Sequence, residues 1–543
     1  MPLPVDRAEP APVPESATQH LVETRDGVRL ATDVYLPADA PGPFPVALTR
    51  LPYDKNGRYT FMEQIAAYLT ARGYAVVVQD VRGKFRSEGE TLPFVHEAAD
   101  GYDTIDWIVR QEWSDGRVGM FGDSYYGATQ WAAVSSGHPA LKAITPRVTG
   151  ADGIRPDAWV RDGVMPFFGL VYYLAYWTDR HAYLFEPDGA RRPFAALAEE
   201  VAASIGVRSP MLDRIVPETR PVAAYPFGHP FDAAPVPVLH QVAWFDNCLQ
   251  FGLEDWTALA DRPGWAPLQY FRADSTDHEN FHLDDVPVPP ELHHGENDAA
   301  LARMLPRYLD DVVEFFDVFV KQTRDRKTLP RVRWHHGHDG PRTASSWPPP
   351  GVRTREWFLT PEALVTEAPS GSDALTWAHD PADLVPSLIP DSFSAVLYDA
   401  DESEVHDRPD VLTVTTAPFA APFDLAGPVT ATLTVGTDGP SAHVYLKLCD
   451  VAPDGRARML LRNQKRIAGG EPAPVTFDLT QIGYRVRPGH RLRLHVASSD
   501  FPLFLPHPGT GENPWLAERT AVTTQTLLTG GDQPSALTVT VLD

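Results

Sequence analysis

One serine stands in a stretch that could expose it as a nucleophile. Residues 117–131 (RVGMFGDSYYGATQW) read as an apolar strand, a sharp turn that carries Ser124, and the start of a helix. A serine hydroxyl is a weak nucleophile, so it must protrude where a base can take its proton and where donors can hold an oxyanion. Gly122 and Gly127 leave room for such a turn. The spacing is G-x-S-x-x-G rather than the commoner G-x-S-x-G, so an ordinary strand-to-helix turn stays open as an alternative.

Two further residues could complete a site for acyl transfer. That reaction needs a base for the serine proton and a carboxylate that orients the base. Asp246 follows the apolar run 236–244, and His278 lies in the polar loop after the run 267–272. Because the carboxyl ends of parallel strands share one edge of a sheet, we expect Asp246 and His278 to lie near Ser124. The chain order Ser, Asp, His is the order of α/β-hydrolases, although 19 histidines leave a chance match open.

The segments that would position these residues alternate between strand and helix patterns. Residues 44–50 and 74–80 are short apolar runs, which are typical of parallel strands buried on both faces. Residues 61–72 and 97–110 have helical periodicity. This order predicts an α/β sheet whose carboxyl edge carries Ser124.

Further segments extend this sheet. Residues 20–35 alternate around Asp26-Gly27 and predict a hairpin, and residues 310–321 predict an amphipathic helix that covers the sheet. The first 18 residues are rich in Pro, Ala and Glu, and we expect them to be disordered.

An aromatic-rich segment of irregular helical pattern interrupts the α/β pattern from about residue 147 to 231. We interpret it as an inserted helical cap. Its rings either fill the core of the cap or face a substrate. The candidates for substrate binding are Trp159, Phe167, Phe168, Tyr172 and Tyr176.

The pattern changes again near residue 355, to short alternating runs separated by Gly, Asp and Pro. Examples are residues 411–416, 429–437, 491–496 and 536–542. Such evenly spaced strands favour a β-sandwich, in particular a jelly roll. We therefore predict an α/β core from residues 1–146 and 235–354, a helical cap from 147–234, and a jelly-roll sandwich from 355–543.

Composition narrows the partners and the compartment. The net charge of −25, with no basic patch, argues against binding nucleic acid or an anionic membrane. We find no apolar window of 18 residues and no signal-peptide pattern, and two cysteines do not suggest a disulfide framework. We expect a cytoplasmic protein, and a homodimer stays open.

Several motifs together resemble the cocaine-esterase and Xaa-Pro dipeptidyl-peptidase family of serine hydrolases. That family uses G-x-S-Y-x-G, which removes the misfit at Ser124. The resemblance spans nearly the whole chain and implies an α/β-hydrolase core, a helical cap and a jelly roll. The matching motifs are FGDSYYGATQW (121–131), PYDK (52–55), QDVRGKFRSEG (79–89), WFD (244–246), PGHRL (488–492) and SSDFP (498–502).

The resemblance implies a role for each candidate residue. Ser124 would be the nucleophile, Asp246 the orienting acid and His278 the base. The oxyanion hole would consist of the backbone N–H of Tyr125 and the phenol of Tyr53, two donors suited to a tetrahedral oxyanion. The substrate would be a small-molecule ester or amide, and no metal or organic cofactor is implied.

The surroundings of His278 depart from the family pattern. Residues 275–280 (STDHEN) are more acidic than the Trp-Ser-His expected of a cocaine-esterase-like member, and Asp123 adds another carboxylate. These acids hint at a cationic or amine-bearing substrate, although surface acid explains them equally well. The histidine clusters 293–294 and 335–338 lie in Gly/Pro/Asp-rich stretches without a helical pair of ligands, so we interpret them as solvated loop histidines rather than a metal site.

The function expected is hydrolysis of an ester or amide through an acyl-enzyme. Three alternatives remain: an acyltransferase or cyclase that uses the same acyl-enzyme, an Xaa-Pro dipeptidyl aminopeptidase, and an inactive hydrolase whose sandwich binds carbohydrate. Intact Ser124, Asp246 and His278 count against the last of these.

Overall fold

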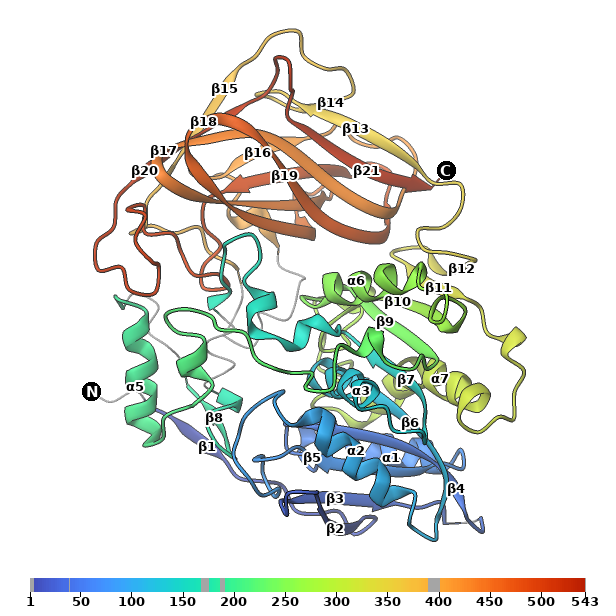
Figure 1. Cartoon of the computed structure of the whole chain (residues 1–543). Helices are drawn as coiled ribbons and strands as arrows, with labels where there is room; N and C mark the ends of the chain where they lie inside the picture. The colour runs from blue at the N-terminus through green and yellow to red at the C-terminus, as the bar shows by residue number, and fades with distance from the viewer. Residues whose placement is uncertain (1–3, 39, 168–174, 186–190, 389–400, 543) are drawn as a thin grey trace.

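The computed structural model describes residues 4–38, 40–167, 175–185, 191–388 and 401–542. Within these residues two large sheets dominate (Figure 1). An α/β part holds the ten-stranded sheet, and a C-terminal β-sandwich is stacked on it. The predicted combination of an α/β core with a C-terminal β-sandwich is confirmed.

The ten-stranded sheet forms from two separate lengths of chain. All neighbouring pairs from β5 to β11 are parallel, and antiparallel strands close both edges. The hairpin predicted from residues 20–35 is therefore confirmed at one edge. The spatial order is β12 (Gly340–Ala344), β11 (Val332–His336), β10 (Gln269–Asp277), β9 (Val238–Phe245), β7 (Leu141–Arg147), β6 (Ser114–Asp123), β4 (Phe44–Leu51), β5 (Ala75–Asp80), β3 (Arg29–Tyr35) and β2 (Thr18–Glu23).

Helices cover both faces of this sheet, which explains why central strands such as β4, β5 and β9 are buried along their whole length and are mainly apolar. In β5, Val76 and Val78 pack with α1 (Met62–Thr70) and α7 (Asp298–Phe319). Ala75 and Val77 point to the other face and join the core of α2 (Glu97–Ile108), α3 (Ser124–Ser136) and the end of α6 (Leu249–Ala260). Side chains alternate along a strand, so a strand between two helical layers needs an apolar residue at each step.

Helix α7 begins at Asp298, twelve residues before the predicted start at Asp310. Pro306 lies inside the helix, although a proline in a helix interior usually ends or kinks it. The start is fixed instead by Asn297, whose side chain accepts the N–H groups of Ala299 and Ala300.

The N-terminal lead is ordered from residue 4, so the prediction of disorder over the first 18 residues was wrong. Strand β1 (Asp6–Ala8) pairs antiparallel with β8 (Ala182–Leu184) in the cap region. Farther on, the N–H of Ala11 donates to Asp54 Oδ2 at 2.7 Å. These hydrogen bonds to other parts of the chain hold the lead segment in place, although its own composition favours disorder.

The segment between the two halves of the sheet, which we interpret as a helical cap, is mostly irregular in its described residues. It contains short 3₁₀ turns, strand β8 and the helix α5 (Ala195–Ile205). Lys84 ties it to the core, because its buried ammonium donates to the backbone carbonyls of Tyr176, Asp179 and His181. Burial lowers the pKa of Lys84 to about 7.

The C-terminal sheet has nine antiparallel strands among the described residues. Its centre is a long hairpin in which two strands pair along almost their whole lengths, with register shifts near residues 428–441. The predicted run 429–437 falls inside the first of these strands, which continues to Val451. The strands are β13 (Arg353–Leu359), β14 (Leu364–Val365), β15 (Ala374–His379), β16 (Leu412–Thr415), β17 (Phe423–Val451), β18 (Ala457–Val486), β19 (Arg491–Ala497), β20 (Thr523–Leu528) and β21 (Ala536–Leu542).

One hydrophobic interior joins the two sheets. Trp244 of β9 and Trp334 of β11 pack against Trp347, with ring centroids 5.0 and 5.3 Å apart. On the sandwich side Gly483 permits the approach, since a Cβ there would lie 2.8 Å from the ring of Trp334. The α/β part and the sandwich are therefore packed as one body.

Candidate active site

Ser124 occupies the sharp junction between β6 and α3. Its φ of 50° lies in the left-handed region, where a residue with a side chain is strained. A Cβ on Gly122 would lie 2.1 Å from Tyr126 Cδ2, and one on Gly127 would lie 2.5 Å from Thr149 Cγ2. The elbow therefore requires glycine at both positions, which is the physical basis of the spacing in the sequence.

Asp246 and His278 leave the sheet side by side. Phe245 and Asp277 are partners in the parallel register of β9 and β10, so the residues that follow them emerge together at the carboxyl edge. His278 Nδ1 lies 2.6 Å from Asp246 Oδ1, and the Asp246 side chain is fully buried. A carboxylate in this position fixes the ring orientation and keeps a proton on Nδ1.

The loop that carries His278 is a tight hairpin. Asp277 Oδ1 accepts the backbone N–H of Glu279 at 2.9 Å and that of Phe281 at 3.0 Å. These bonds hold the imidazole on a short, internally bonded segment rather than on a long loop.

Two opposing effects act on the pKa of His278. Burial lowers it, because a charged imidazolium is costly away from water. The charge of Asp246 and its hydrogen bond to the ring act in the other direction, and together they raise the pKa of His278 well above its ordinary value. An imidazolium formed during a reaction would therefore be stabilised by Asp246.

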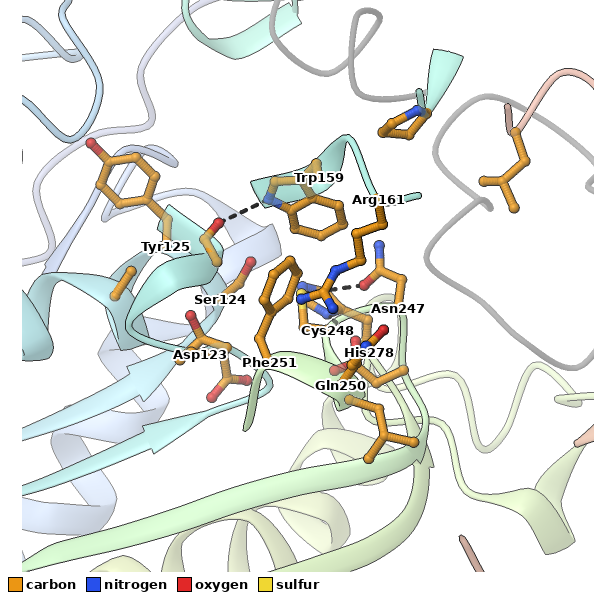
Figure 2. Close-up of a pocket in the computed structure, with 18 of the residues that line it drawn as sticks. Asp123, Ser124, Tyr125, Trp159, Arg161, Asn247, Cys248, Gln250, Phe251 and His278 are labelled. Atoms are coloured by element: carbon orange, nitrogen blue, oxygen red, sulfur yellow. Dashed lines mark hydrogen bonds and ion pairs between the residues drawn. The ribbon is translucent and has the colours of Figure 1, made fainter. Parts of the chain in front are cut away.

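Ser124, Asp246 and His278 line one cavity of about 560 Å³. Figure 2 shows Ser124 and His278 in this pocket together with Trp159 and Phe251. Its walls come from all three parts of the chain, and the sandwich side includes Leu460, Leu503, Phe504 and Trp515. The wall is mainly aromatic and aliphatic, as in pockets that bind small organic ligands.

The two expected oxyanion donors lie at this cavity. The phenol of Tyr125 donates to Glu97 Oε1 at 2.8 Å and accepts the N–H of Phe94 at 2.9 Å, so the side chain is fixed in the core while its backbone directly follows Ser124. Tyr53 lines the cavity after β4, and its ring centroid lies 5.4 Å from that of Tyr176.

Asp123 and Asp277 are buried, so the surface-acid alternative was wrong for them, whereas Glu279 is half-buried. Asp123 is buried, forms an ion pair with Arg147 at 2.9 Å and accepts the phenol of Tyr308 at 2.8 Å. Glu279 lines the cavity and accepts the phenol of Tyr59 at 2.9 Å. Burial raises the pKa of Glu279. Both carboxylates line the cavity, but that of Asp123 is paired with Arg147, whereas that of Glu279 is bonded to a phenol.

The cap aromatics divide into two groups. Trp159 and Tyr176 line the cavity, and Trp159 is fixed by a 2.8 Å hydrogen bond from Nε1 to the carbonyl of Gly153. The prediction for Phe167 was wrong, because its ring packs 5.2 Å from Phe194 and 5.4 Å from Phe501 in a core between cap and sandwich. The predictions for Phe168 and Tyr172 lie outside the described residues.

The histidines interpreted as solvated are largely enclosed. His335 and His336 belong to strand β11, which pairs with β10 and β12, and His336 has no exposed surface. His294 is also buried. The loop interpretation was wrong for His335 and His336, which lie within β11, whereas His338 lies in the turn after β11 and His293 and His294 lie in the loop before α7.

Cys248 was not anticipated as part of the site. It lies two residues after Asp246 at the N-cap of α6, and its Sγ lies within 4.8 Å of ligand atoms of Asp246 and His278. Burial raises the pKa of its thiol to about 11. The turn from β9 into α6 brings the side chain back toward Asp246, and a carboxylate followed two residues later by cysteine is the signal that sequence reading could have used.

The fold and the site define a serine hydrolase on an α/β sheet. Residues 26–271 match the model of the X-Pro dipeptidyl-peptidase (S15 family), and residues 325–538 match that of the X-Pro dipeptidyl-peptidase C-terminal non-catalytic domain. The chain is 32% identical to the cocaine esterase of Rhodococcus sp. (strain MB1 Bresler), over 91% of this chain and 92% of that protein. The chain therefore belongs to the S15 family and is a serine hydrolase of the CocE/NonD type.

Solved structures agree with this fold. An alpha-amino acid ester hydrolase and an aminopeptidase from a marine sediment Thaumarchaeota archaeon superpose with TM-scores of 0.80 and 0.81. Each is 23% identical in sequence, and each match covers 98% of both chains. At this identity the likeness concerns the fold alone.

No helix among the described residues is long and apolar enough to cross a membrane.

Proposed function

We propose that the protein hydrolyses a small-molecule carboxylic ester through an acyl-enzyme on Ser124. The observation that carries this proposal is the 2.6 Å contact between His278 Nδ1 and Asp246 Oδ1 at the cavity that Ser124 lines. With Nδ1 protonated and facing the carboxylate, Nε2 has the lone pair that a general base needs.

Each residue then has a defined step. His278 Nε2 takes the hydroxyl proton as Ser124 Oγ attacks the ester carbonyl, and Asp246 stabilises the imidazolium. The Tyr125 N–H and the Tyr53 phenol hold the oxyanion of the tetrahedral intermediate. The imidazolium protonates the departing alcohol, and a water activated by the same imidazole releases the acid.

The choice of an ester over a peptide rests on the relatives and the pocket. The relative named cocaine esterase matches nearly the whole chain, whereas a relative from Bacillus anthracis whose name includes Xaa-Pro dipeptidyl-peptidase matches 14% of it. Trp159, Tyr176 and Phe251 offer an apolar wall for an acyl group or an alcohol. The peptidase remains the second reading.

The experiment is a panel of aryl and alkyl esters and aminoacyl amides, followed by rapid mixing with the best substrate. We expect a burst of alcohol release, together with labelling of Ser124 by a fluorophosphonate located by peptide mass analysis. A label on another serine would refute the assignment. Products formed in the presence of added alcohols or amines test the acyltransferase or cyclase alternative, because only a transferase forms mainly the exchanged ester or amide.

Replacing Tyr53 with phenylalanine should lower kcat by about 10²–10³, because one oxyanion donor is lost while the ring is kept. The measurement is steady-state hydrolysis of the best ester. Tyr176→Phe is the matched control, since it removes the hydroxyl from a neighbouring tyrosine whose ring centroid lies 5.4 Å from that of Tyr53. Equal effects of the two changes would contradict an oxyanion role for Tyr53.

Glu279 supports a narrower substrate class, esters that bear an amine. Its carboxylate lies next to His278 on the cavity wall, and a cationic group there would gain a charge-assisted hydrogen bond. Glu279→Gln should lower kcat/KM for an amine-bearing ester by about tenfold or more. The neutral isostere of that ester is the control, and an equal loss for both esters would exclude amine recognition by Glu279.

A further inference from the structure

Three metal-binding side chains of different kinds converge at the candidate active site. One ligand atom each from Asp246, Cys248 and His278 lies within 4.8 Å of the others. All three residues line the cavity, so an ion has a path to them from solvent, and Figure 2 shows Cys248 and His278 on the pocket wall. Carboxylate, thiolate and imidazole are the ligand types that zinc prefers.

A second observation at the same place is the unsatisfied oxygen of Asp246. Oδ1 is bound to His278, whereas Oδ2 has no hydrogen-bond partner among the described residues, although the side chain is fully buried. The thiol of Cys248 makes a long contact with Asn247 Oδ1 at 3.5 Å and also interacts with the ring of His278. A buried acceptor without a donor is the kind of atom that a cation satisfies.

Charge and distance both suit a divalent ion. One M²⁺ with a carboxylate, a thiolate and a neutral imidazole gives a net charge of zero, which avoids the cost of an isolated buried charge. Zinc bonds of about 2.0–2.3 Å place tetrahedral ligand atoms roughly 3.3–3.7 Å apart. The three ligand atoms lie within 4.8 Å of one another, so shifts of about 1 Å in the side chains would bring them to this spacing. A fourth ligand position would remain for a water from the cavity.

We propose that Asp246, Cys248 and His278 form an inhibitory site for a thiophilic divalent cation such as Zn²⁺, an inference that rests on the proposed role of His278. The ion replaces the proton on Cys248 Sγ, which goes to solvent, and the ring proton of His278 moves from Nδ1 to Nε2 by exchange with water. The ring stays neutral, and Nε2 then has no lone pair for the hydroxyl of Ser124. Binding of the ion thus stops acyl transfer, and removal of the ion restores it.

The first test titrates Zn²⁺ against ester hydrolysis, with each variant normalised to its own metal-free rate. We expect inhibition that EDTA reverses. Loss of a group that only orients a metal ligand lowers metal affinity about 10–100-fold. Cys248→Ala removes a ligand itself, so it should raise the half-inhibiting Zn²⁺ concentration by at least about 100-fold. Cys248→Ser, which keeps the size of the side chain, should raise it as well.

The control is His335→Ala. His335, His282 and Asp274 form a second group of three potential ligands behind the His278 hairpin. The inference requires that His335→Ala keep the sensitivity to Zn²⁺. Loss of sensitivity in that variant, or unchanged inhibition of Cys248→Ala, would overturn it.

The second test does not depend on turnover. Co²⁺ added to the full-length protein, and to the Ser124→Ala variant, should produce a near-ultraviolet thiolate-to-cobalt band that is missing in Cys248→Ser. Absence of the band from both proteins would overturn the inference. If the band forms but the metal-free protein hydrolyses no ester, the proposed function fails and the metal site stands.

Discussion

Replacing Ser124 with alanine should lower kcat for ester hydrolysis by a factor on the order of 10⁶, the scale at which a serine hydrolase loses its nucleophile. Only the catalysis that comes from substrate binding and the oxyanion donors should remain. Fluorophosphonate labelling should disappear together with turnover. The measurement is steady-state kinetics and intact-protein mass on the same preparation.

The fold should survive this change, because alanine at position 124 adopts the φ of 50° at a cost similar to that of serine. Ser136→Ala is the matched control, since Ser136 lies at the other end of α3 and its hydroxyl donates to the carbonyl of Ala133. That variant should keep both activity and label. A labelled Ser124→Ala protein would show that another serine attacks.

Replacing Asp246 with asparagine should lower kcat by about 10⁴, because an amide can donate to Nδ1 and stabilise the tautomer that leaves the proton on Nε2. The pH profile provides a second readout. Asp246 raises the pKa of His278, so its loss should lower that pKa and move the acid limb of kcat/KM to lower pH. A purely structural role would not move the limb in this direction.

Asp255→Asn is a stringent control for this prediction. Asp255 is also buried and lies on α6, where it accepts the N–H of Ala151 at 2.8 Å. Burial raises the pKa of Asp255 well above its ordinary value, and asparagine keeps the size and the acceptor oxygen of the side chain. Asp255→Asn should keep kcat within about an order of magnitude of wild type, the scale of a lost neutral hydrogen bond. Equal losses in the two variants would remove Asp246 from catalysis.

The sequence predicts those features of the candidate site that depend only on residues close together in the chain. The apolar runs ending before Asp246 and His278 and the glycines around Ser124 each reflect a nearby steric or register constraint. Because parallel strands end at one edge of the sheet, residues that directly follow different strands come together even when they are far apart in the sequence.

The missed features depend on contacts between distant segments. Phe167 faces a core completed by Phe501, more than 300 residues away, and no periodicity within the cap reveals that. The lead segment is ordered by pairing with β8. Cys248 was missed because its neighbour in space, His278, is 30 residues away, although the turn that points it toward Asp246 is local.

The sandwich matches a domain described as non-catalytic, yet Leu460, Leu503, Phe504 and Trp515 form part of the cavity wall. The residues that shape the cavity therefore come from both halves of the chain. A comparison of relatives restricted to the sequence around Ser124, Asp246 and His278 would miss differences at these four positions. It would therefore place enzymes with different substrate pockets in one group. A chimaera in which the sandwich is replaced by that of a relative would change the wall of the cavity as well as the domain packed on the α/β part.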